Sequence, residues 1–496
     1  MGIIDPRFEV WINLRMWITG GQCITKCARK STSAILALMQ DYREYFKGKK
    51  VTLMGLGLLG RGIGDAAFLA ECGALVTVTD KKSDAELAAS VEALKKYPNI
   101  IFHLGGHRTE DFTSADLVIK AAGVPLDAPE IAAAKQKGVQ VAMSTALFAK
   151  FAREAGAKIV GVTGTRGKST VTIMIYHNLK QAGKSVLLGG NVRGTSTLAL
   201  LPELSEGNPR TKIVVLELDS WQLQGFGDLE MSPDVAVFTN LMPDHQNYYI
   251  SMDEYFADKA NIFKFQKEGD SLFVGQQVLE RVSATRPSVA PQVPSAIPAD
   301  WKLNVIGEHN RENASLAAGA LRALGLSEEE IRSGLESFQP VEGRLQFVRE
   351  LNGIKIYNDN NATTPEATIA ALRALSPNLK SKISKLVLIV GGSEKGSDLK
   401  ELVGEIKKRA SLVVVLTHAN YKGSERLMGE LKAAGVAFEE AETLRDAIEK
   451  GTKGNNGRNG EKGKEALLFS PGFASFGMFK NEYDRNDQFV RLVNEL

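Results

Sequence analysis

The chain has 496 residues, of which 44% are hydrophobic and 24% are charged, and its formal net charge is +3. This length is too great for one hydrophobic core and predicts about three domains. Positions 1–38 hold five basic and two acidic residues, so the remainder is neutral and nothing indicates a nucleic-acid-binding surface. No apolar run approaches the roughly 18 residues of a membrane span, so we expect no membrane insertion. Three cysteines do not make a disulfide framework and fit a reducing, cytoplasmic location.

The first 47 residues are predicted to be a poorly ordered extension. Positions 1–38 lack a clear periodicity, and Met39 directly precedes the region in which regular signals begin. We interpret positions 1–38 as an upstream segment that the fold does not need. A signal peptide is the alternative, but no compact apolar stretch of about 7–15 residues with a small-residue cleavage site follows the basic residues.

A first α/β domain is predicted over residues 48–146. Its first strand, Val51–Met54, runs into the glycine-rich turn Gly55–Gly60, and its second strand ends at Asp80, about 20 residues later. This arrangement is typical of a mononucleotide-binding half. A dehydrogenase would use the same pattern for a dinucleotide, and a tight turn between packed elements would produce it without binding anything.

A phosphate-binding loop is predicted at Gly161–Thr170, which reads GVTGTRGKST and follows an apolar strand. A helix that opens on Lys-Ser-Thr directs free backbone N–H groups and its dipole to one point, which forms an anion cradle. Lys168 would reach the terminal phosphates, and the hydroxyl of Ser169 or Thr170 would help to hold Mg²⁺. The common spacing has a glycine where this chain has Val162, so a purely structural strand-turn-helix corner is the alternative.

This loop belongs to a central α/β domain, predicted over residues 147–340. The buried strand Lys212–Leu218 carries Glu217 near its end, as expected of a Mg²⁺-holding strand beside a phosphate loop. A second strand, Val235–Phe238, leads into a polar segment that ends at His245. An acidic residue precedes this histidine at the carboxyl end of a strand, so we favour a site role for it over a core histidine.

A third α/β unit is predicted over residues 341–496. Its strands are Gly353–Tyr357, Lys385–Val390, Leu412–Leu416 and Ala466–Phe469. Between the last two lies Gly451–Lys464, a tract rich in Gly, Asn and Lys that cannot bury apolar surface. We expect this tract to be a mobile, solvated loop, and contact of its charges with phosphates is the less favoured alternative.

Eight motifs follow one another in a fixed order through the three predicted domains. They are Thr163–Thr170 (TGTRGKST), Leu216–Leu223 (LELDSWQL), Asn240–His245, Lys259, Gly307–Asn313 (GEHNREN), Asn358–Pro365, Gly391–Asp398 (GGSEKGSD) and Ser470–Ser475 (SPGFAS). In these motifs the chain resembles the Mur ligase family over nearly all of residues 41–496. The family's version of the phosphate loop, Thr-Gly-Thr-x-Gly-Lys, accounts for the departure at Val162.

The resemblance implies an α/β fold of three domains: an N-terminal Rossmann-like UDP-binding domain, a central P-loop-type ATPase domain and a C-terminal Rossmann-like domain. It also implies an ATP- and Mg²⁺-dependent ligase of peptidoglycan precursor synthesis. In that reaction ATP phosphorylates a substrate carboxylate, and an amino group then displaces phosphate. The implied substrates are UDP-N-acetylmuramoyl-L-alanine and D-glutamate, and the enzyme is expected to be a monomer. A site shared by three domains implies closure on binding, which excludes water.

Individual residues acquire roles through this resemblance. Lys168, Glu217, His245 and Lys259 are implied to be catalytic. Lys259 matches the lysine that the family carbamylates, which would replace an ammonium that repels Mg²⁺ with an anion that can ligate it. Without the resemblance, Lys259 would be interpreted as a solvated helix lysine.

The remaining implied contacts fall into three groups. The implied metal ligands are Ser169, Glu217, His245 and carbamylated Lys259. The implied nucleotide contacts are Gly164, Thr165, Gly167, Lys168, Ser169, Thr170, Asn310, Asn313, Arg344 and Asp359. The implied substrate contacts are Gly55, Gly57, Leu58, Leu59, Gly60 and Asp80 for the uridine diphosphate, Asn191 for the sugar, and Thr363, Lys395 and Ser475 for the incoming glutamate.

Several positions depart from the family pattern, and they bear on contacts more than on the reaction class. Asn361 stands where the family has a lysine near the phosphates, and Asp219 stands where it has a serine. Two other assignments stay open. One is a relative that adds another amino acid, such as the L-alanine-adding ligase or a folylpolyglutamate synthase. The other is an NTPase that is not a ligase, or a dehydrogenase. The Gly55 domain argues against the folate enzymes, and Lys168 argues against a dehydrogenase.

Overall fold

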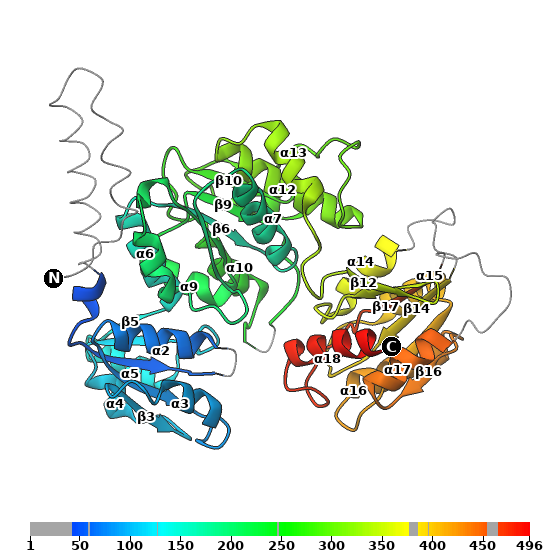
Figure 1. The fold of residues 1–496 in the computed structure, drawn as a ribbon, viewed down its shortest axis with the longest axis horizontal. Helices are drawn as coiled ribbons and strands as arrows, with labels where there is room; N and C mark the ends of the chain where they lie inside the picture. The colour runs from blue at the N-terminus through cyan, green and yellow to red at the C-terminus, as the bar shows by residue number, and fades with distance from the viewer. Residues whose placement is uncertain are drawn as a thin grey trace, which may run out of the picture. The chain divides into compact units, whose positions relative to one another are not determined.

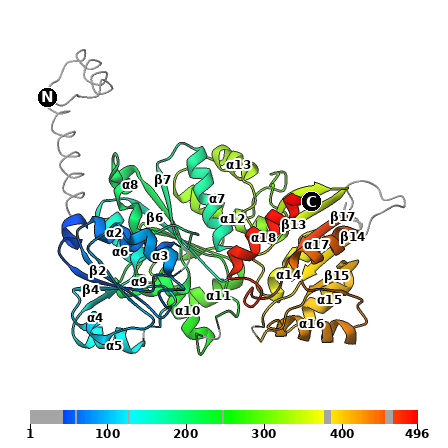
Figure 2. The ribbon, with the colours of Figure 1, turned by 60° about the horizontal axis from the view of Figure 1, so that its bottom comes forward.

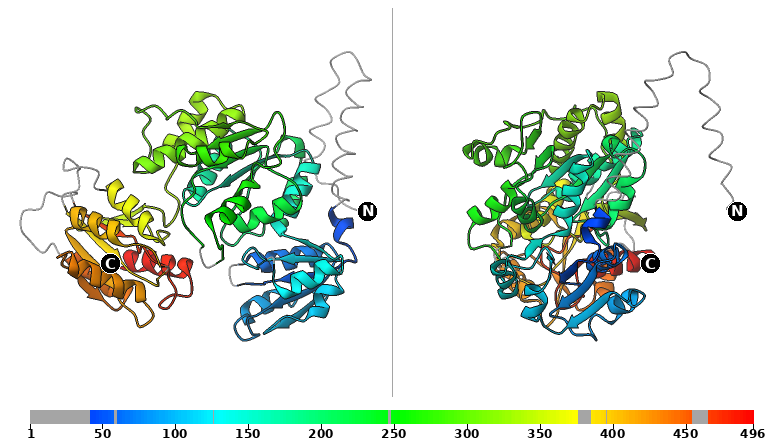
Figure 3. Two further views of the ribbon diagram at one scale, coloured as in Figure 1. Left: turned by 180° about the vertical axis from the view of Figure 1, so that it is seen from behind. Right: turned by 90° about the vertical axis from the view of Figure 1, so that its left-hand side faces the viewer.

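The computed structural model describes residues 42–57, 60–125, 127–245, 248–375, 385–394, 396–453 and 465–496. The chain forms two compact units, which are treated separately below. The first comprises the chain up to Ile159, Leu187–Leu216 and Ser220–Met231, and the second comprises Val160–Val186, Glu217–Asp219 and Ser232–Leu496. Figure 1 colours these parts along the chain from blue to red, and Figure 3 gives the same ribbon from behind and from the side.

The described end of the predicted extension is ordered, contrary to expectation. Residues 42–46 are helical, and Tyr42 and Phe46 are buried. The ring of Tyr42 stacks on Phe68, and the ring of Phe46 meets Phe151 edge-on. The aromatic residues just after Met39 therefore join the core of the first unit. The prediction that positions 1–38 are dispensable concerns residues outside the described ranges.

The N-terminal sheet has five parallel strands in the order β3-β2-β1-β4-β5. The strands are β1 (Lys50–Met54), β2 (Leu75–Asp80), β3 (Ile100–Leu104), β4 (Leu117–Lys120) and β5 (Gln140–Ala142). The helices are α2 (Arg61–Glu71), α3 (Ala88–Leu94), α4 (Thr109–Thr113), α5 (Pro129–Gln136) and α6 (Ser144–Glu154). The strand order reverses between β1 and β4. In open α/β sheets the crevice at that point, outside the carboxyl ends of the strands, is where ligands bind.

The central sheet has six strands in the order β11-β10-β9-β6-β8-β7. The strands are β6 (Lys158–Thr163), β7 (Val186–Gly190), β8 (Ile213–Glu217), β9 (Val235–Phe238), β10 (Ser271–Val274) and β11 (Pro291–Gln292). The helices are α7 (Lys168–Gln181), α8 (Leu201–Ser205), α9 (Ser220–Asp228), α10 (Met252–Ala260), α11 (Leu279–Ala284), α12 (Glu308–Ala323) and α13 (Glu328–Ser337). The phosphate-loop strand β6 thus has β9 and β8 as its neighbours.

Among the described residues, the C-terminal sheet has the order β12-β13-β17-β14-β15-β16, in which the β12/β13 pair is antiparallel and the other pairs are parallel. Figure 2 labels β13, β17, β14 and β15 of this sheet. The strands are β12 (Gln346–Leu351), β13 (Ile354–Asn358), β14 (Lys385–Val390), β15 (Leu412–Leu416), β16 (Glu439–Ala441) and β17 (Glu465–Phe469). The helices are α14 (Pro365–Leu375), α15 (Lys400–Arg409), α16 (Lys422–Ala433), α17 (Leu444–Lys453) and α18 (Glu482–Glu495).

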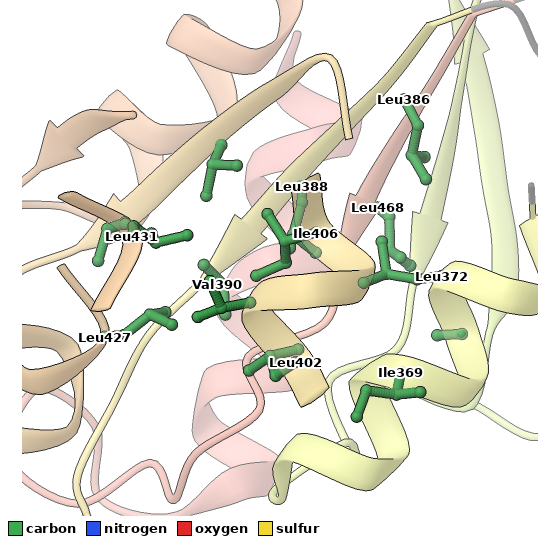
Figure 4. Packing of buried hydrophobic residues seen from close by; sticks show 14 of the residues in the cluster. Ile369, Leu372, Leu386, Leu388, Val390, Leu402, Ile406, Leu427, Leu431 and Leu468 are labelled. Atoms are coloured by element: carbon green, nitrogen blue, oxygen red, sulfur yellow. The ribbon is translucent and has the colours of Figure 1, made fainter. Parts of the chain in front are cut away.

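Both faces of the C-terminal sheet are covered, which explains its continuous apolar strands. In β14, Leu388 and Val390 pack on one face with side chains of α14, α15 and α16, while Ile389 packs on the other with α17 and α18. Figure 4 shows Ile406 of α15 beside Leu388 in the first of these cores. The alternation follows from the two-residue period of a strand.

The predicted α/β architecture of three domains is confirmed, and the predicted strands recur with small shifts at their ends. The domain limits stay a prediction, and the expected limit at residue 147 falls inside α6. Gly451–Lys453, taken as the start of a loop, form the last turn of α17, and residues 454–464 lie outside the described ranges. Within the described ranges, no helix is long and apolar enough to cross a membrane.

Candidate active site

The phosphate loop connects β6 to α7 and requires glycine at two positions. Gly164 has a φ of 139°, and a Cβ there would lie 1.9 Å from the hydroxyl of Thr239. Gly167, which precedes the first turn of α7, has a φ of 82°, and a Cβ there would lie 2.4 Å from Oδ1 of Asn313. The loop is therefore held in a conformation that directs the helix N-terminus at one point, as an anion site requires.

The segment after β9 fixes the phosphate loop from the neighbouring strand. The amide of Thr165 donates to the carbonyl oxygen of Asn240 at 2.9 Å, and the amide of Arg166 donates to the side-chain oxygen of Asn240 at 2.9 Å. The hydroxyl of Thr239 donates to the carbonyl oxygen of Arg166 at 2.5 Å. The polar residues that follow this strand thus preorganise the loop.

Lys168 folds back onto the loop. Its Nζ donates to the carbonyl oxygens of Gly164 at 3.0 Å and Thr165 at 3.1 Å. Burial lowers the pKa of Lys168, and the charge of Glu217 opposes that shift. The side chain of Glu217 is buried at the end of β8. The structure therefore brings the predicted phosphate-binding lysine and the predicted metal-binding acid into one electrostatic environment.

Lys259 is buried, unlike a solvated helix lysine. It lies in the last turn of α10 with 1% of its surface exposed, and its Nζ donates to the carbonyl oxygen of Gly164 at 3.0 Å. The same ammonium lies 4.6 Å from the ring centre of Tyr255. Burial, reinforced by the charge of Lys168, places the pKa of Lys259 well below its usual value. Neutral amine is the reactive form of a lysine.

His245 occupies a strained turn next to an acid. Its φ is 53°, in the left-handed region, and its amide donates to the carboxylate of Asp244 at 2.9 Å. Its ring meets that of Tyr255 edge-on with centres 6.0 Å apart. Such backbone conformations at non-glycine residues are uncommon and cluster at functional sites.

The donor chemistry at this point fits Mg²⁺, which prefers oxygen ligands and commonly takes one or two carboxylates together with substrate phosphates. Glu217 supplies a buried carboxylate and Ser169 a hydroxyl. In the part of the chain that the structure describes, no group of three or more His, Cys, Asp or Glu side chains is placed to hold a metal. The predicted ligand set of Ser169, Glu217, His245 and carbamylated Lys259 stays a prediction.

Residues predicted to contact the nucleotide come from α12 and from the start of the C-terminal domain. Asn313 donates to the side-chain oxygen of Asn310 at 3.1 Å while lying against Gly167. Arg344 donates to the hydroxyl of Ser169 at 3.0 Å. Asp359, the other predicted nucleotide contact of this domain, makes its hydrogen bonds with Leu345 and Ser470.

Asp359 is buried, and its carboxyl oxygens accept hydrogen bonds from the amide of Leu345 at 3.0 Å and from the hydroxyl of Ser470 at 2.8 Å. Burial raises the pKa of Asp359 to about 7, against the lowering effect of these hydrogen bonds and of Arg344. Asp359, which follows β13, thus ties together the residue just before β12 and the segment that follows β17.

Two residues that the sequence analysis did not single out organise these loops. Arg166 donates to the hydroxyl of Thr364 at 2.7 Å and lies 3.5 Å from the carboxylate of Asp244. It occupies the variable position of the phosphate-loop motif, so the motif gives no signal for it. Its cation lies near the chain segment in which Asn361 replaces a lysine.

The second is Arg485, whose side chain is fully buried in α18. It donates to the side-chain and main-chain oxygens of Asn360 at 2.7 and 2.9 Å, and to the carbonyl oxygen of Phe473 at 3.2 Å. It thereby fixes the segments that carry Thr363 and Ser475. Ser475 itself is 2% exposed, while Thr363 lines a small cavity with Gly472 and Phe473.

The glycine-rich turn of the first unit is bound by Asp80. One carboxyl oxygen of Asp80 accepts hydrogen bonds from the amides of Leu56 at 2.9 Å and Gly57 at 3.1 Å, and the other accepts one from the amide of Lys82 at 2.9 Å. Asp80 thus shapes the turn, and its contact with a ligand stays a prediction. Leu58, Leu59 and Lys395 lie outside the described residues.

Asn191 follows β7 and is held by α2. Its side-chain oxygen accepts a hydrogen bond from Arg61 Nη2 at 2.6 Å. A cavity of about 230 Å³ lies beside this contact, lined by the glycine-rich turn, the start of α2, the end of β4 and Gly190. The predicted uridine-diphosphate and sugar contacts thus come from elements around one cavity in the first unit.

Three family models match successive parts of the chain. The Mur ligase MurD-like N-terminal domain matches residues 49–143, the Mur ligase middle domain matches 162–284, and the Mur ligase glutamate ligase domain matches 343–458. The first of these spans the glycine-rich turn and Asp80, and the second spans the phosphate loop and Lys259.

Known proteins match over most of their length. A UDP-N-acetylmuramoylalanine--D-glutamate ligase from Roseiflexus sp. (strain RS-1) is 32% identical over 480 residues, which cover 90% of this chain and 98% of that protein. The crystal structure of the UDP-N-acetylmuramate-alanine ligase MurC from Thermotoga maritima shares the fold with a TM-score of 0.56 and 21% identity, covering 90% of this chain and 99% of that one. The structure of the MurF ligase from Thermotoga maritima in complex with ADP gives a TM-score of 0.55 at 17% identity, covering 91% and 96%. Since 32% identity extends over 90% of the chain and three domain models follow in order, this chain belongs to the Mur ligase family.

Proposed function

We propose that this chain is an ATP-dependent amide ligase that joins D-glutamate to UDP-N-acetylmuramoyl-L-alanine through an acyl phosphate. One observation carries the proposal: a phosphate loop on which two lysines, partly buried Lys168 and buried Lys259, donate to the same carbonyl oxygen of Gly164. The names of relatives such as the Roseiflexus ligase support the choice of substrates. ATP use and the buried thiol of Cys72 suit a cytoplasmic enzyme, which we expect to act as a monomer.

The phosphate loop would bind the nucleotide. The amides at the start of α7 and the ammonium of Lys168 supply positive charge for phosphates, and Arg344 adds a guanidinium beside Ser169. Asn310 and Asn313 would meet the adenine, while Thr165 and Thr170 would contact the phosphates. Phosphoryl transfer needs charge neutralisation and in-line positioning more than covalent help from the protein.

Ser169 and Glu217 would hold Mg²⁺, with His245 and carbamylated Lys259 as the other proposed ligands. When bound, the metal would supply positive charge that neutralises the phosphate and carboxylate oxygens. A carboxylate is a poor electrophile, and phosphorylation gives it a good leaving group. Exclusion of water then favours attack by an amine over hydrolysis of the acyl phosphate.

The N-terminal domain and the segment after β7 would bind the nucleotide sugar. Gly55, Gly57, Gly60, Asp80 and Asn191 are proposed to hold the nucleotide sugar.

The incoming glutamate is proposed to meet Thr363, Lys395 and Ser475. Its two carboxylates suit an ammonium and hydroxyl donors. The amine must arrive neutral, attack the acyl carbon and release a proton as phosphate leaves.

Phosphate release is the test. The protein is incubated with ATP, Mg²⁺, UDP-N-acetylmuramoyl-L-alanine and a panel of D-glutamate, L-glutamate, L-alanine and glycine. We expect release only when both the acceptor and D-glutamate are present. Equal release without either substrate would overturn the ligase proposal, and strict dependence on another amino acid would favour a different member of the family. Lys168→Ala is the negative control, and it should release little phosphate under the same conditions.

A further inference from the structure

Arg166 lies within the phosphate loop, and both of its main-chain polar groups are held by residues that follow β9. Its amide donates to the side-chain oxygen of Asn240 at 2.9 Å. Its carbonyl oxygen accepts hydrogen bonds from the hydroxyl of Thr239 at 2.5 Å and from the side-chain amide of Asn240 at 3.2 Å. The point at which the side chain of Arg166 leaves the backbone is therefore fixed.

The guanidinium of Arg166 uses few of its hydrogen-bond donors. Its Nη2 donates to the hydroxyl of Thr364 at 2.7 Å, and its Nη1 lies 3.5 Å from the carboxylate of Asp244. Its Nε is buried and, among the residues that the structure describes, has no hydrogen-bond partner. A guanidinium has five N–H donors and no acceptor, so most of these donors are unused. The side chain is 26% exposed, so a ligand can reach the guanidinium.

Several cations gather at the phosphate loop. Lys168 and Lys259 both donate to its main chain, and Arg344 donates to the first turn of α7. Burial lowers the pKa of Lys168, and the charges of Arg166 and Arg344 add to that lowering, while the charge of Glu217 opposes it. The cations therefore repel one another. Positive charge gathered in this way is costly unless the site binds an anion.

The position of Arg166 suits a phosphate bound at the loop. Its side chain contacts Asp244, in the segment after β9, and Thr364, which directly precedes α14. The amides at the start of α7 and Lys168 are proposed to hold the phosphates, and Arg166 would add a charged donor from the loop itself. A guanidinium can donate to two oxygens of one phosphate in parallel. Arginine commonly stabilises the charge of a transferred phosphoryl group.

We propose that Arg166 contacts the γ-phosphate of ATP and stabilises the phosphoryl group while it is transferred to the acceptor carboxylate. The inference rests on the proposed function, because it names a further residue for that reaction. In the transfer, a carboxylate oxygen forms a bond to phosphorus, the bond from phosphorus to the bridging oxygen of ADP breaks, and that oxygen keeps the electron pair. The guanidinium donates hydrogen bonds to the phosphoryl oxygens, on which the negative charge is spread.

Nucleotide binding tests the contact without turnover. ADP and the non-hydrolysable analogue β,γ-methylene-ATP are titrated calorimetrically into the protein with Mg²⁺, in the absence of acceptor and D-glutamate. Arg166→Ala should weaken binding of the analogue by about tenfold or more, the effect of losing one charge-assisted hydrogen bond. Its affinity for ADP, which has no γ-phosphate, should stay within about twofold of the wild-type value. Equal losses for both nucleotides, or no loss for either, would overturn the inference.

Thr364→Val separates phosphate binding from a purely structural role of Arg166. If Arg166 serves only to hold the start of α14, removal of its hydroxyl partner should reproduce Arg166→Ala, and that result would overturn the inference. If Arg166 binds phosphate, Thr364→Val should keep the ratio of the two nucleotide affinities within about twofold of the wild-type ratio. Arg332→Ala removes an exposed arginine of α13 and is the control, which should change neither affinity.

Arg166→Gln decides the question if Arg166→Ala fails to fold. Glutamine can still donate to Thr364 but carries no charge. Because a charge-assisted hydrogen bond is roughly twice as strong as a neutral one, Arg166→Gln should bind β,γ-methylene-ATP about fivefold more weakly than the wild type. Its affinity for ADP should again stay within about twofold. A wild-type affinity for the analogue in Arg166→Gln would overturn the inference.

Turnover gives a second measurement and shows which proposal fails. Arg166→Ala should lower kcat by about 10²–10³, the typical cost of one contact to developing charge, and leave the KM for D-glutamate within about twofold. A wild-type protein that releases no phosphate with UDP-N-acetylmuramoyl-L-alanine and D-glutamate contradicts the proposed function, and the nucleotide titrations still decide whether Arg166 meets the γ-phosphate. Normal turnover by the wild type, with unchanged kcat and analogue affinity in Arg166→Ala, contradicts only the role of Arg166.

Discussion

Lys168 and Lys259 donate to one and the same acceptor, the carbonyl oxygen of Gly164, each at 3.0 Å. Two ammonium groups that share an oxygen in a buried site repel each other, and Lys168 contributes to the low pKa of Lys259. The repulsion is relieved if Lys259 is neutral. Burial lowers the pKa of Lys168 too, but that of Lys259 lies well below its usual value, so the neutral, nucleophilic amine is favoured at Lys259.

The first prediction is that the neutral amine of Lys259 reacts with CO₂. Protein equilibrated with ¹³C-labelled bicarbonate should show a carbamate carbon signal that is absent from Lys259→Ala. The exposed Lys264, one turn further along the chain, is the matched control, and Lys264→Ala should keep the signal. Lys259→Ala should lose on the order of 10²–10³ in kcat, the typical cost of one electrostatic contact in a transition state. Short carboxylic acids should restore part of that rate, and an unchanged rate in Lys259→Ala would refute the role.

The second prediction concerns Lys168→Ala. The ammonium of Lys168 is needed chiefly in the transition state, when negative charge develops on the phosphoryl group. Its removal should therefore lower kcat by about 10²–10³. The Tm should not fall, because the change removes a buried cation rather than a packed apolar group. Lys180→Ala, at the exposed end of the same helix, should leave both kcat and Tm unchanged. A variant that keeps more than about a tenth of the rate would show that Lys168 serves only the loop's structure.

The third prediction is that Arg485 holds two loops of the C-terminal domain. Arg485→Ala leaves the carbonyl oxygens of Asn360 and Phe473 without this donor, and breaking such a buried charged contact typically costs about 3–5 kcal/mol. The melting transition should fall by roughly 5 °C or more, and the KM for D-glutamate should rise. Arg491→Ala on the same helix, where the side chain is 66% exposed, is the control and should be neutral. Equal behaviour of the two variants would contradict the prediction.

The phosphate loop and most strands were predictable because they depend on local patterns. Val235–Phe238 and Lys385–Val390 are apolar runs that end at polar turns, and the structure has strands with the same limits. Lys168 could be placed because a glycine-rich turn followed by a helix leaves few conformations. A few neighbouring residues are enough to specify these features.

The contacts made by isolated polar residues were not predictable. Arg61 and Asp65 act on a segment about 130 residues away, and nothing in their local sequence distinguishes them from surface residues of a helix. The sequence predicted poor order for residues 42–46. Their order comes from packing against Phe68 and Phe151, which are distant in sequence, so the local pattern does not reveal it. The burial of Lys259 likewise depends on tertiary packing, since its immediate sequence reads as an ordinary helix end.

The last prediction is a pH dependence of stability caused by Asp359. Its pKa is about 7 in the folded protein and 3.8 without the fold, so the native state favours the protonated form. The corresponding stability is fully present below about pH 4 and is lost as the pH rises through about 7. Asp359→Asn cannot ionise, its oxygen can still accept from the amide of Leu345, and its NH₂ group can donate to Ser470. Relative to the wild type, the variant should therefore gain on the order of 1–3 kcal/mol between pH 5 and pH 8. Urea denaturation at the two pH values measures this difference. Glu366 is an exposed acid on α14, and Glu366→Gln should change the free energy of unfolding by the same small amount at both pH values. A difference between Asp359→Asn and wild type that does not grow with pH would mean that the carboxyl group is already ionised at pH 5 in the folded protein.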